Sequence, residues 1–130
     1  MSQTKILIVE DERFLSPILA SRMEKEGFGI RQAFDGEEAL SLLKTEKPDL
    51  IVLDLILPKK SGFEVLESIS ADPQLSQVPV VILSNLGQDS DFQKAKKLGA
   101  IEYHIKIKTS VDNFIGIVKN ILGIVQGSKS

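Results

Sequence analysis

The chain has 130 residues, no cysteine, and a formal net charge of −2 from 16 basic and 18 acidic side chains. This length suits one domain with one core. The absence of cysteine excludes disulfides, thiolate metal sites and cysteine nucleophiles. The balanced charge predicts no direct nucleic-acid binding, and no apolar run reaches the roughly 20 residues that span a membrane. With no signal-peptide pattern at residues 1–5, the composition favours a cytoplasmic location.

Five short apolar runs alternate with five segments of helical periodicity. The predicted strands are Lys5–Glu10, Gly29–Ala33, Leu50–Asp54, Val80–Ser84 and Glu102–Ile105. The predicted helices cover 14–26, 37–45, a segment capped by Ser61, 88–98 and 110–125. Strands without polar alternation are buried on both faces, so we expect a parallel, doubly wound α/β sheet with helices on each side.

Polar side chains gather where these strands end. Ligands of such sheets bind at the carboxyl ends of the strands. Four candidate residues follow or close a strand there: Asp11, Asp54, Ser84 and Lys106. A carboxylate is costly to bury, so Asp54 at the end of an apolar run indicates a function.

These residue types fit phosphoryl chemistry. Asp11 and Asp54 can share a divalent cation such as Mg²⁺, which prefers hard oxygen ligands. Asp54 can act as a nucleophile and form an acyl phosphate. The Ser84 hydroxyl can donate to a phosphoryl oxygen, and Lys106 can hold a carboxylate before transfer and a phosphoryl oxygen afterwards.

Four segments in this order resemble the receiver domain of two-component response regulators. They are Val9-Glu10-Asp11, Leu53-Asp54-Leu55-Ile56-Leu57-Pro58, Ile82-Leu83-Ser84 and the run from Gly99 to Lys106. The resemblance implies a flavodoxin-like sheet with strand order 2-1-3-4-5 in a domain of residues 1–125, followed by a flexible tail at 126–130.

The resemblance also implies the site. Asp54 would be the phosphoacceptor, with Mg²⁺ or Mn²⁺ on Asp11, Asp54 and the backbone carbonyl of Ile56, and with Glu10 helping through water. Ser84 and Tyr103 would form the switch pair, in which a local charge change biases a two-state element.

Partners follow from the same resemblance. A sensor histidine kinase or a histidine phosphotransfer protein would supply the phosphoryl group. A downstream protein would bind the surface made by the fourth helix, fifth strand and fifth helix. The broad apolar stripe of the last helix, widened by Ile117 and Ile124, fits either a wide core face or a surface for a partner or a homodimer. With no room for an output domain, the chain is expected to be a single-domain regulator or one domain of a longer protein.

Four positions depart from the common pattern of this family. Glu10 stands where a second aspartate is common, and Ser61 replaces an aspartate while keeping the helix cap. Asn85 follows Ser84, where a smaller residue is usual, so its amide is expected to narrow access to the phosphoryl group. Ile107 replaces the usual proline after Lys106, and we expect a trans bond because a non-proline cis bond costs about 2.5–4 kcal/mol.

Other interpretations of the same residues stay open. Asp54 could be only a strand-end cap or a salt-bridge partner, Ser84 a strand-end hydrogen bond, and Tyr103 an ordinary half-buried aromatic residue. The single histidine, His104, is left out of the site.

Three other classes of protein can be compared with the same sequence. A pseudo-receiver would keep the fold as an unphosphorylated interaction module. A dehalogenase-like phosphatase would need an aspartate at position 56, and a flavodoxin would need a Ser/Thr/Gly phosphate loop where residues 10–12 are acidic.

Overall fold

A single parallel sheet organises the molecule. The computed structural model describes residues 3–125, with side chains through residue 123, so the predicted tail at 126–130 lies outside the described residues. The strands are β1 (Lys5–Val9), β2 (Gly29–Ala33), β3 (Leu50–Leu53), β4 (Val80–Ser84) and β5 (Glu102–Ile105). They pair in the order β2-β1-β3-β4-β5, all parallel, which confirms the predicted strand order.

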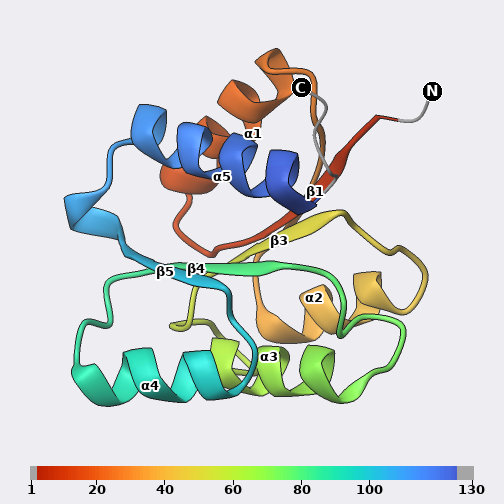
Figure 1. Ribbon diagram of the computed structural model, residues 1–130, viewed down its shortest axis with the longest axis vertical. Coiled ribbons are helices and arrows are strands. Elements are labelled where there is room, and N and C mark those ends of the chain that lie inside the picture. The colour runs from red at the N-terminus through yellow and green to blue at the C-terminus, as the bar shows by residue number, and fades with distance from the viewer. Residues whose placement is uncertain (1–2, 126–130) are drawn as a thin grey trace.

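Helices cover both faces of the sheet (Figure 1). On one face lie α1 (Leu15–Lys25) and α5 (Val111–Val125). On the other lie α2 (Gly36–Leu43), α3 (Gly62–Ala71) and α4 (Asp89–Lys97). A short 3-10 turn, η1 (Lys106–Lys108), joins β5 to α5. The predicted doubly wound architecture is therefore confirmed.

The strands alternate their side chains between two hydrophobic clusters. In β3, Ile51 and Leu53 pack with α2 and α3, whereas Leu50 and Val52 pack with α1 and α5. All four side chains are buried, as expected for a strand covered on both faces. The apolar residues of β3 therefore hold it at the centre of the sheet, paired with β1 on one side and β4 on the other.

Two strands end one residue earlier than predicted. The sequence predicts β1 to include Glu10 and β3 to include Asp54, but the strands end at Val9 and Leu53. The first amide beyond each strand is still bonded, since Glu10 donates to Ala33 and Asp54 donates to Val9, both at 3.0 Å. Both carboxylates therefore lie just beyond the ladder, on backbone that the sheet still holds.

Local capping sets the starts of two helices. Asp35 accepts a hydrogen bond from the amide of Glu38, so α2 begins at Gly36, one residue before its predicted start. Ser61 and Glu64 form the predicted capping box at the start of α3. Among the described helices, none combines the length and apolar character that crossing a membrane requires.

Candidate functional site

The register of the sheet brings two carboxylates together. Val9 pairs with Leu53 across β1 and β3, so Glu10 and Asp54 leave adjacent strands at the same edge. Both side chains are buried, with relative exposures of 2% for Glu10 and 3% for Asp54. Two buried carboxylates of like charge require a nearby cation.

Lys106 supplies that cation from the other side of β4. Its Nζ lies 2.6 Å from Asp54 Oδ2, and 2.8 and 2.9 Å from the two carboxylate oxygens of Glu10. The lysine side chain is only 8% exposed. When Glu10 is ionised, one ammonium facing two carboxylates leaves an excess of negative charge, which favours binding of a further cation.

The buried cluster shifts two protonation equilibria. Burial raises the pKa of Glu10 to about 7, against the lowering effect of its hydrogen bond with Lys106. Burial alone would lower the pKa of Lys106, but its hydrogen bonds to Asp54 and Glu10 outweigh that effect and raise it. Lys106 therefore stays charged, while the charge on Glu10 depends on pH near neutrality.

Asp11 completes a cluster of three carboxylates. One oxygen each from Glu10, Asp11 and Asp54 lie within 4.8 Å of one another, and Asp11 is partly exposed. This all-carboxylate set fits a hard divalent cation such as Mg²⁺. Glu10 is predicted to help bind the metal through water. In the structure Glu10 also pairs directly with Lys106. The amide of Ile56 donates to Asp54 Oδ1 at 3.1 Å, which orders the loop that carries its carbonyl.

Ser84 and Tyr103 meet at a single loop residue. Ser84 is fully buried, and its Oγ accepts a weak hydrogen bond from the amide of Leu86 at 3.4 Å. The Tyr103 hydroxyl donates to the carbonyl of Leu86 at 2.7 Å, and its ring stands edge-on to Phe92. Burial raises the pKa of Tyr103 to about 12. Within residues 3–123, Ser84 shares no hydrogen bond with Asp54, so the predicted switch pair is joined through Leu86.

The two unusual neighbours, Asn85 and Ile107, contact each other. Asn85 Oδ1 accepts a hydrogen bond from the Ile107 amide at 3.0 Å. The Lys106–Ile107 peptide bond is trans, as predicted, since the described residues contain no cis bond. His104 instead pairs with Glu102 at 2.7 Å and stands edge-on to the ring of Phe114, so it lies outside the carboxylate cluster.

The sequence prediction missed two features of this edge. Gly62 packs against Asp54, where an added Cβ would lie 2.2 Å from the Asp54 carbonyl oxygen. Three large apolar side chains close to site residues in the sequence are exposed: Phe14 (86%), Ile56 (54%) and Ile107 (81%). The sequence offers two signals for these features: a glycine eight residues after Asp54, and single apolar residues that follow the charged site residues. Neither signal reveals that the glycine approaches the Asp54 backbone or that the apolar side chains are exposed.

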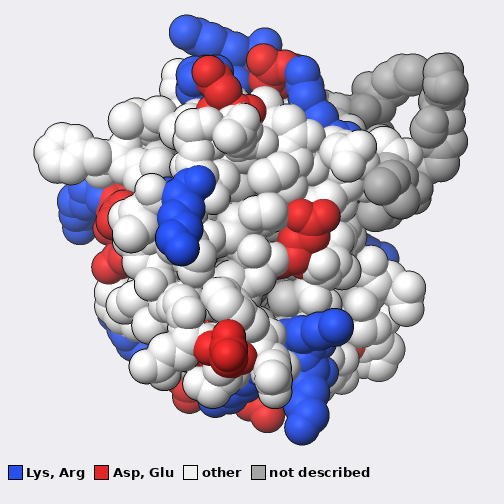
Figure 2. Space-filling view, turned by 60° about the vertical axis from the view of Figure 1, so that its left-hand side comes forward, with Lys and Arg blue, Asp and Glu red and all other residues white. Residues whose placement is uncertain are grey.

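Surface charge is scattered on the face seen in Figure 2. Uncharged residues fill much of this face, and basic and acidic side chains are interspersed on it.

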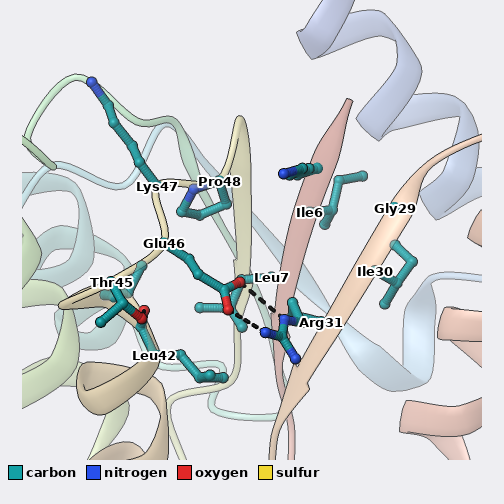
Figure 3. A pocket seen from close by; sticks show the side chains of 12 residues that line it. Ile6, Leu7, Gly29, Ile30, Arg31, Leu42, Thr45, Glu46, Lys47 and Pro48 are labelled. Atoms are coloured by element: carbon teal, nitrogen blue, oxygen red, sulfur yellow. Dashed lines mark hydrogen bonds and ion pairs between the residues drawn. The ribbon is translucent and has the colours of Figure 1, made fainter. Parts of the chain in front are cut away.

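A separate cavity of about 460 Å³ lies among the first residues of β1 and β2 and the end of α2 (Figure 3). The guanidinium of Arg31 pairs there with the carboxylate of Glu46. Because this cavity is at the amino ends of the strands, it is separate from the carboxylate cluster.

Comparison with known families identifies this arrangement. The family model of the response regulator receiver domain matches residues 6–112. The chain belongs to the response regulator receiver family. The receiver domain is 40% identical over 106 residues to a probable transcriptional regulator ycf27 of Porphyridium aerugineum. That match covers 82% of the chain and 43% of the relative, so the chain spans less than half of the length of the curated relatives that it matches first.

Solved structures of receiver domains resemble it over nearly their whole length. The phosphorylated cyanobacterial phytochrome response regulator RcpA superposes with a TM-score of 0.83 at 30% identity, covering 99% of this chain and 98% of that one. The Mn²⁺-bound form of response regulator Rcp1 superposes with a TM-score of 0.77 at 29% identity, covering 95% and 90%. The receiver domain thus shares its fold with regulators described as phosphorylated and as metal-bound.

Proposed function

We propose that this receiver domain accepts a phosphoryl group on Asp54 from a phosphohistidine. The observation that carries the proposal is the contact of Lys106 Nζ with Asp54 Oδ2 at 2.6 Å, beside a cluster of three carboxylates. A buried aspartate held by a buried lysine is ordered in one position and screened from bulk water. Such preorganisation favours reaction at the carboxylate over simple strand capping.

Transfer would be a single displacement at phosphorus. An oxygen of Asp54 attacks phosphorus, a P–O bond forms, and the P–N bond to the donor histidine breaks as its imidazole leaves. Lys106, already within hydrogen-bond distance of Asp54, would stabilise the charge that moves onto the phosphoryl oxygens. The Ser84 hydroxyl would donate a hydrogen bond to a phosphoryl oxygen, once its own hydrogen bond from the Leu86 amide has broken. Attack of water on phosphorus would later break the bond between phosphorus and the Asp54 oxygen, which releases inorganic phosphate and regenerates the carboxylate without another enzyme.

Asp11, Asp54 and Glu10 would hold the metal, together with the carbonyl of Ile56. Bound Mg²⁺, or Mn²⁺ in its place, would offset repulsion between Asp54 and the incoming phosphoryl oxygens. The donor set supports this ion because all three side chains are carboxylates whose oxygens lie within 4.8 Å. Glu10 would serve the site by pairing with Lys106 as well as through water.

The phosphodonor would be a sensor histidine kinase or a histidine phosphotransfer protein in the cytoplasm. It must cover the edge of the sheet beyond which the buried Asp54 carboxylate lies. The exposed side chains of Phe14, Ile56 and Ile107 lie within three residues of Asp11, Asp54 and Lys106 along the chain. Exposed apolar groups around a polar centre are typical of a protein contact, so we assign them to the donor.

The output surface would be the face of α4, β5 and α5. Among the α4 residues only Ala95 is fully buried, so this helix is weakly anchored and suited to movement. Loss of the Ser84–Leu86 contact on phosphorylation would release one tie to the loop that precedes α4. A downstream protein, or a second copy of the chain, would bind the altered face.

One experiment tests the phosphoacceptor. The protein is incubated with Mg²⁺ and a small acyl-phosphate donor, and a single added phosphoryl group is sought by intact mass. Asp54→Asn should abolish the adduct. Asp49→Asn, whose carboxylate instead accepts from the Lys5 amide at the other end of β3, should keep it. An unlabelled wild-type protein, or labelling without Mg²⁺, would favour the pseudo-receiver acting by binding alone.

A further inference from the structure

A hydrogen bond joins the two loops that border the carboxylate cluster. Asn85 follows Ser84 at the end of β4, and Ile107 follows Lys106 at the start of η1. The Asn85 Oδ1 atom accepts from the Ile107 amide at 3.0 Å. Since β4 and β5 are neighbours, with Ser84 opposite Ile105, this bond ties the loop after β4 to the turn that carries Lys106.

The turn around Lys106 needs an acceptor from outside. The first amides of a helical turn have no acceptor within the turn. Thr109 closes η1 through its amide to Lys106 and its hydroxyl to Ile105. The Ile107 amide instead donates to the Asn85 side chain. A proline at position 107 would have no N–H to donate, so this hydrogen bond requires a residue other than proline there.

The bond bears on Asp54 only through the lysine. Lys106 has a flexible four-carbon stem, so the place of its ammonium depends on where its backbone is held. The next residue along that backbone is the one that Asn85 fixes. Within residues 3–123, Asn85 makes no hydrogen bond with Asp54 or Glu10, so any effect on the site passes through Ile107.

We infer that Asn85 is a positioning residue that holds the Lys106 turn through the Ile107 amide. It thereby couples the loop carrying Ser84 and Leu86 to the lysine that contacts Asp54. The inference rests on the proposed role of Asp54 as phosphoacceptor. If Asn85 positions Lys106, it speeds uptake of the phosphoryl group. If Asn85 only narrowed access to Asp54, it would slow uptake.

The first test measures the bond without any phosphorylation. Amide hydrogen exchange at Ile107 is compared in the wild type, in Asn85→Ala and in Asn120→Ala, an exposed asparagine on α5. Protection at Ile107 should fall about 2- to 10-fold in Asn85→Ala, the range expected for one lost hydrogen bond, and stay unchanged in the control. Asn85→Asp keeps an acceptor oxygen and should retain the protection. Unchanged protection in Asn85→Ala would overturn the inference even if Asp54 is phosphorylated.

The second test connects the bond to phosphoryl uptake from a small acyl phosphate with Mg²⁺. Asn85→Ala and Ile107→Pro should each slow uptake about 2- to 10-fold, and the double variant should be no slower than either, because both remove the same bond. Faster uptake in Asn85→Ala would mean that the side chain only blocks access, and additive effects would mean separate roles. Either result would overturn the inference. If Ile107→Pro does not fold, slower uptake in Asn85→Ala with recovery in Asn85→Asp supports it, and no recovery contradicts it.

Discussion

Gly62 lies against Asp54 so closely that a Cβ atom on the glycine would sit 2.2 Å from the Asp54 carbonyl oxygen. The Gly62 amide also donates to the carbonyl of Leu55 at 3.0 Å. The start of α3 therefore supports the backbone of the candidate phosphoacceptor directly. No side chain can be added there without moving one or the other.

Gly62→Ala should destabilise the protein by about 1–3 kcal/mol, the usual cost of overpacking a rigid contact. It should also slow phosphoryl uptake, because relief of the clash displaces the backbone of Asp54. Urea unfolding and intact mass measure the two effects. Gly116→Ala is the matched control, since its added Cβ meets nothing within 4 Å in α5 and should be stabilising by up to about 1 kcal/mol. A Gly62→Ala protein with wild-type stability and uptake would contradict the prediction.

The raised pKa of Glu10 predicts a pH-dependent stability in the metal-free protein. The folded state holds the Glu10 proton up to about pH 7, whereas the unfolded chain releases it near 4.5. The folded state thus binds more protons between these values, and the free energy of unfolding must fall as pH rises through that window. The contribution is complete below about pH 4.5 and is lost above about pH 7, up to about 3 kcal/mol.

Glu10→Gln isolates this contribution because it cannot titrate. Urea unfolding in a chelator from pH 4.5 to pH 8 should give a steeper fall for the wild type than for Glu10→Gln. Glu12→Gln, at an exposed carboxylate 3.7 Å from Lys106, should leave the shape of the wild-type profile unchanged. Parallel profiles for the wild type and Glu10→Gln would argue against a raised pKa.

Asp11 should be needed for Mg²⁺ binding. Its carboxylate is the partly exposed member of the three-carboxylate cluster and has no contact with Lys106 among the described ion pairs. Asp11→Asn should weaken Mg²⁺ affinity at least as much as the roughly 10- to 100-fold lost when outer-shell partners of a metal are removed. Titration calorimetry measures the affinity, with Asp49→Asn as control. An affinity in Asp11→Asn within twofold of the wild type would place the ion elsewhere.

Much of this site could be predicted from the sequence, because apolar runs fix the strands and a carboxylate at a strand end is conspicuous. The pairing of Lys106 with Glu10 could not, since these residues follow β5 and β1, which the sheet separates by β3 and β4. In the sequence, Phe14 and Ile18 follow the same helical spacing of apolar residues as Leu19 and Met23. In the structure Phe14 and Ile18 are exposed, because α1 buries only the stripe that faces the sheet. Spacing identifies an apolar position but not whether the packed helix covers it.

The exposed Phe14 should matter for a protein donor far more than for a small one. Phe14→Ser should reduce phosphoryl transfer from a phosphorylated histidine phosphotransfer protein by about tenfold or more, as expected for an aromatic anchor in an interface. Uptake from a small acyl phosphate should fall much less. Ile101→Ser, at another exposed apolar residue before β5, serves as control. Equal losses with both donors would indicate damage to the site and not to docking.

Lys59 adopts a backbone conformation that favours glycine. Its φ of 69° lies in the left-handed region, in the loop between β3 and α3, and its Nζ lies 3.6 Å from Asp35 Oδ2. This conformation costs a non-glycine residue about 1–2 kcal/mol, and the exposed ion pair offsets little of that cost. Lys59→Gly should therefore raise the free energy of unfolding by about 0.5–1 kcal/mol, measured by urea unfolding. Lys60→Gly, one residue on and without a positive φ, should lower it, because glycine only adds freedom to the unfolded chain there. A loss of stability in Lys59→Gly equal to that in Lys60→Gly would mean that the left-handed backbone of Lys59 stores no strain.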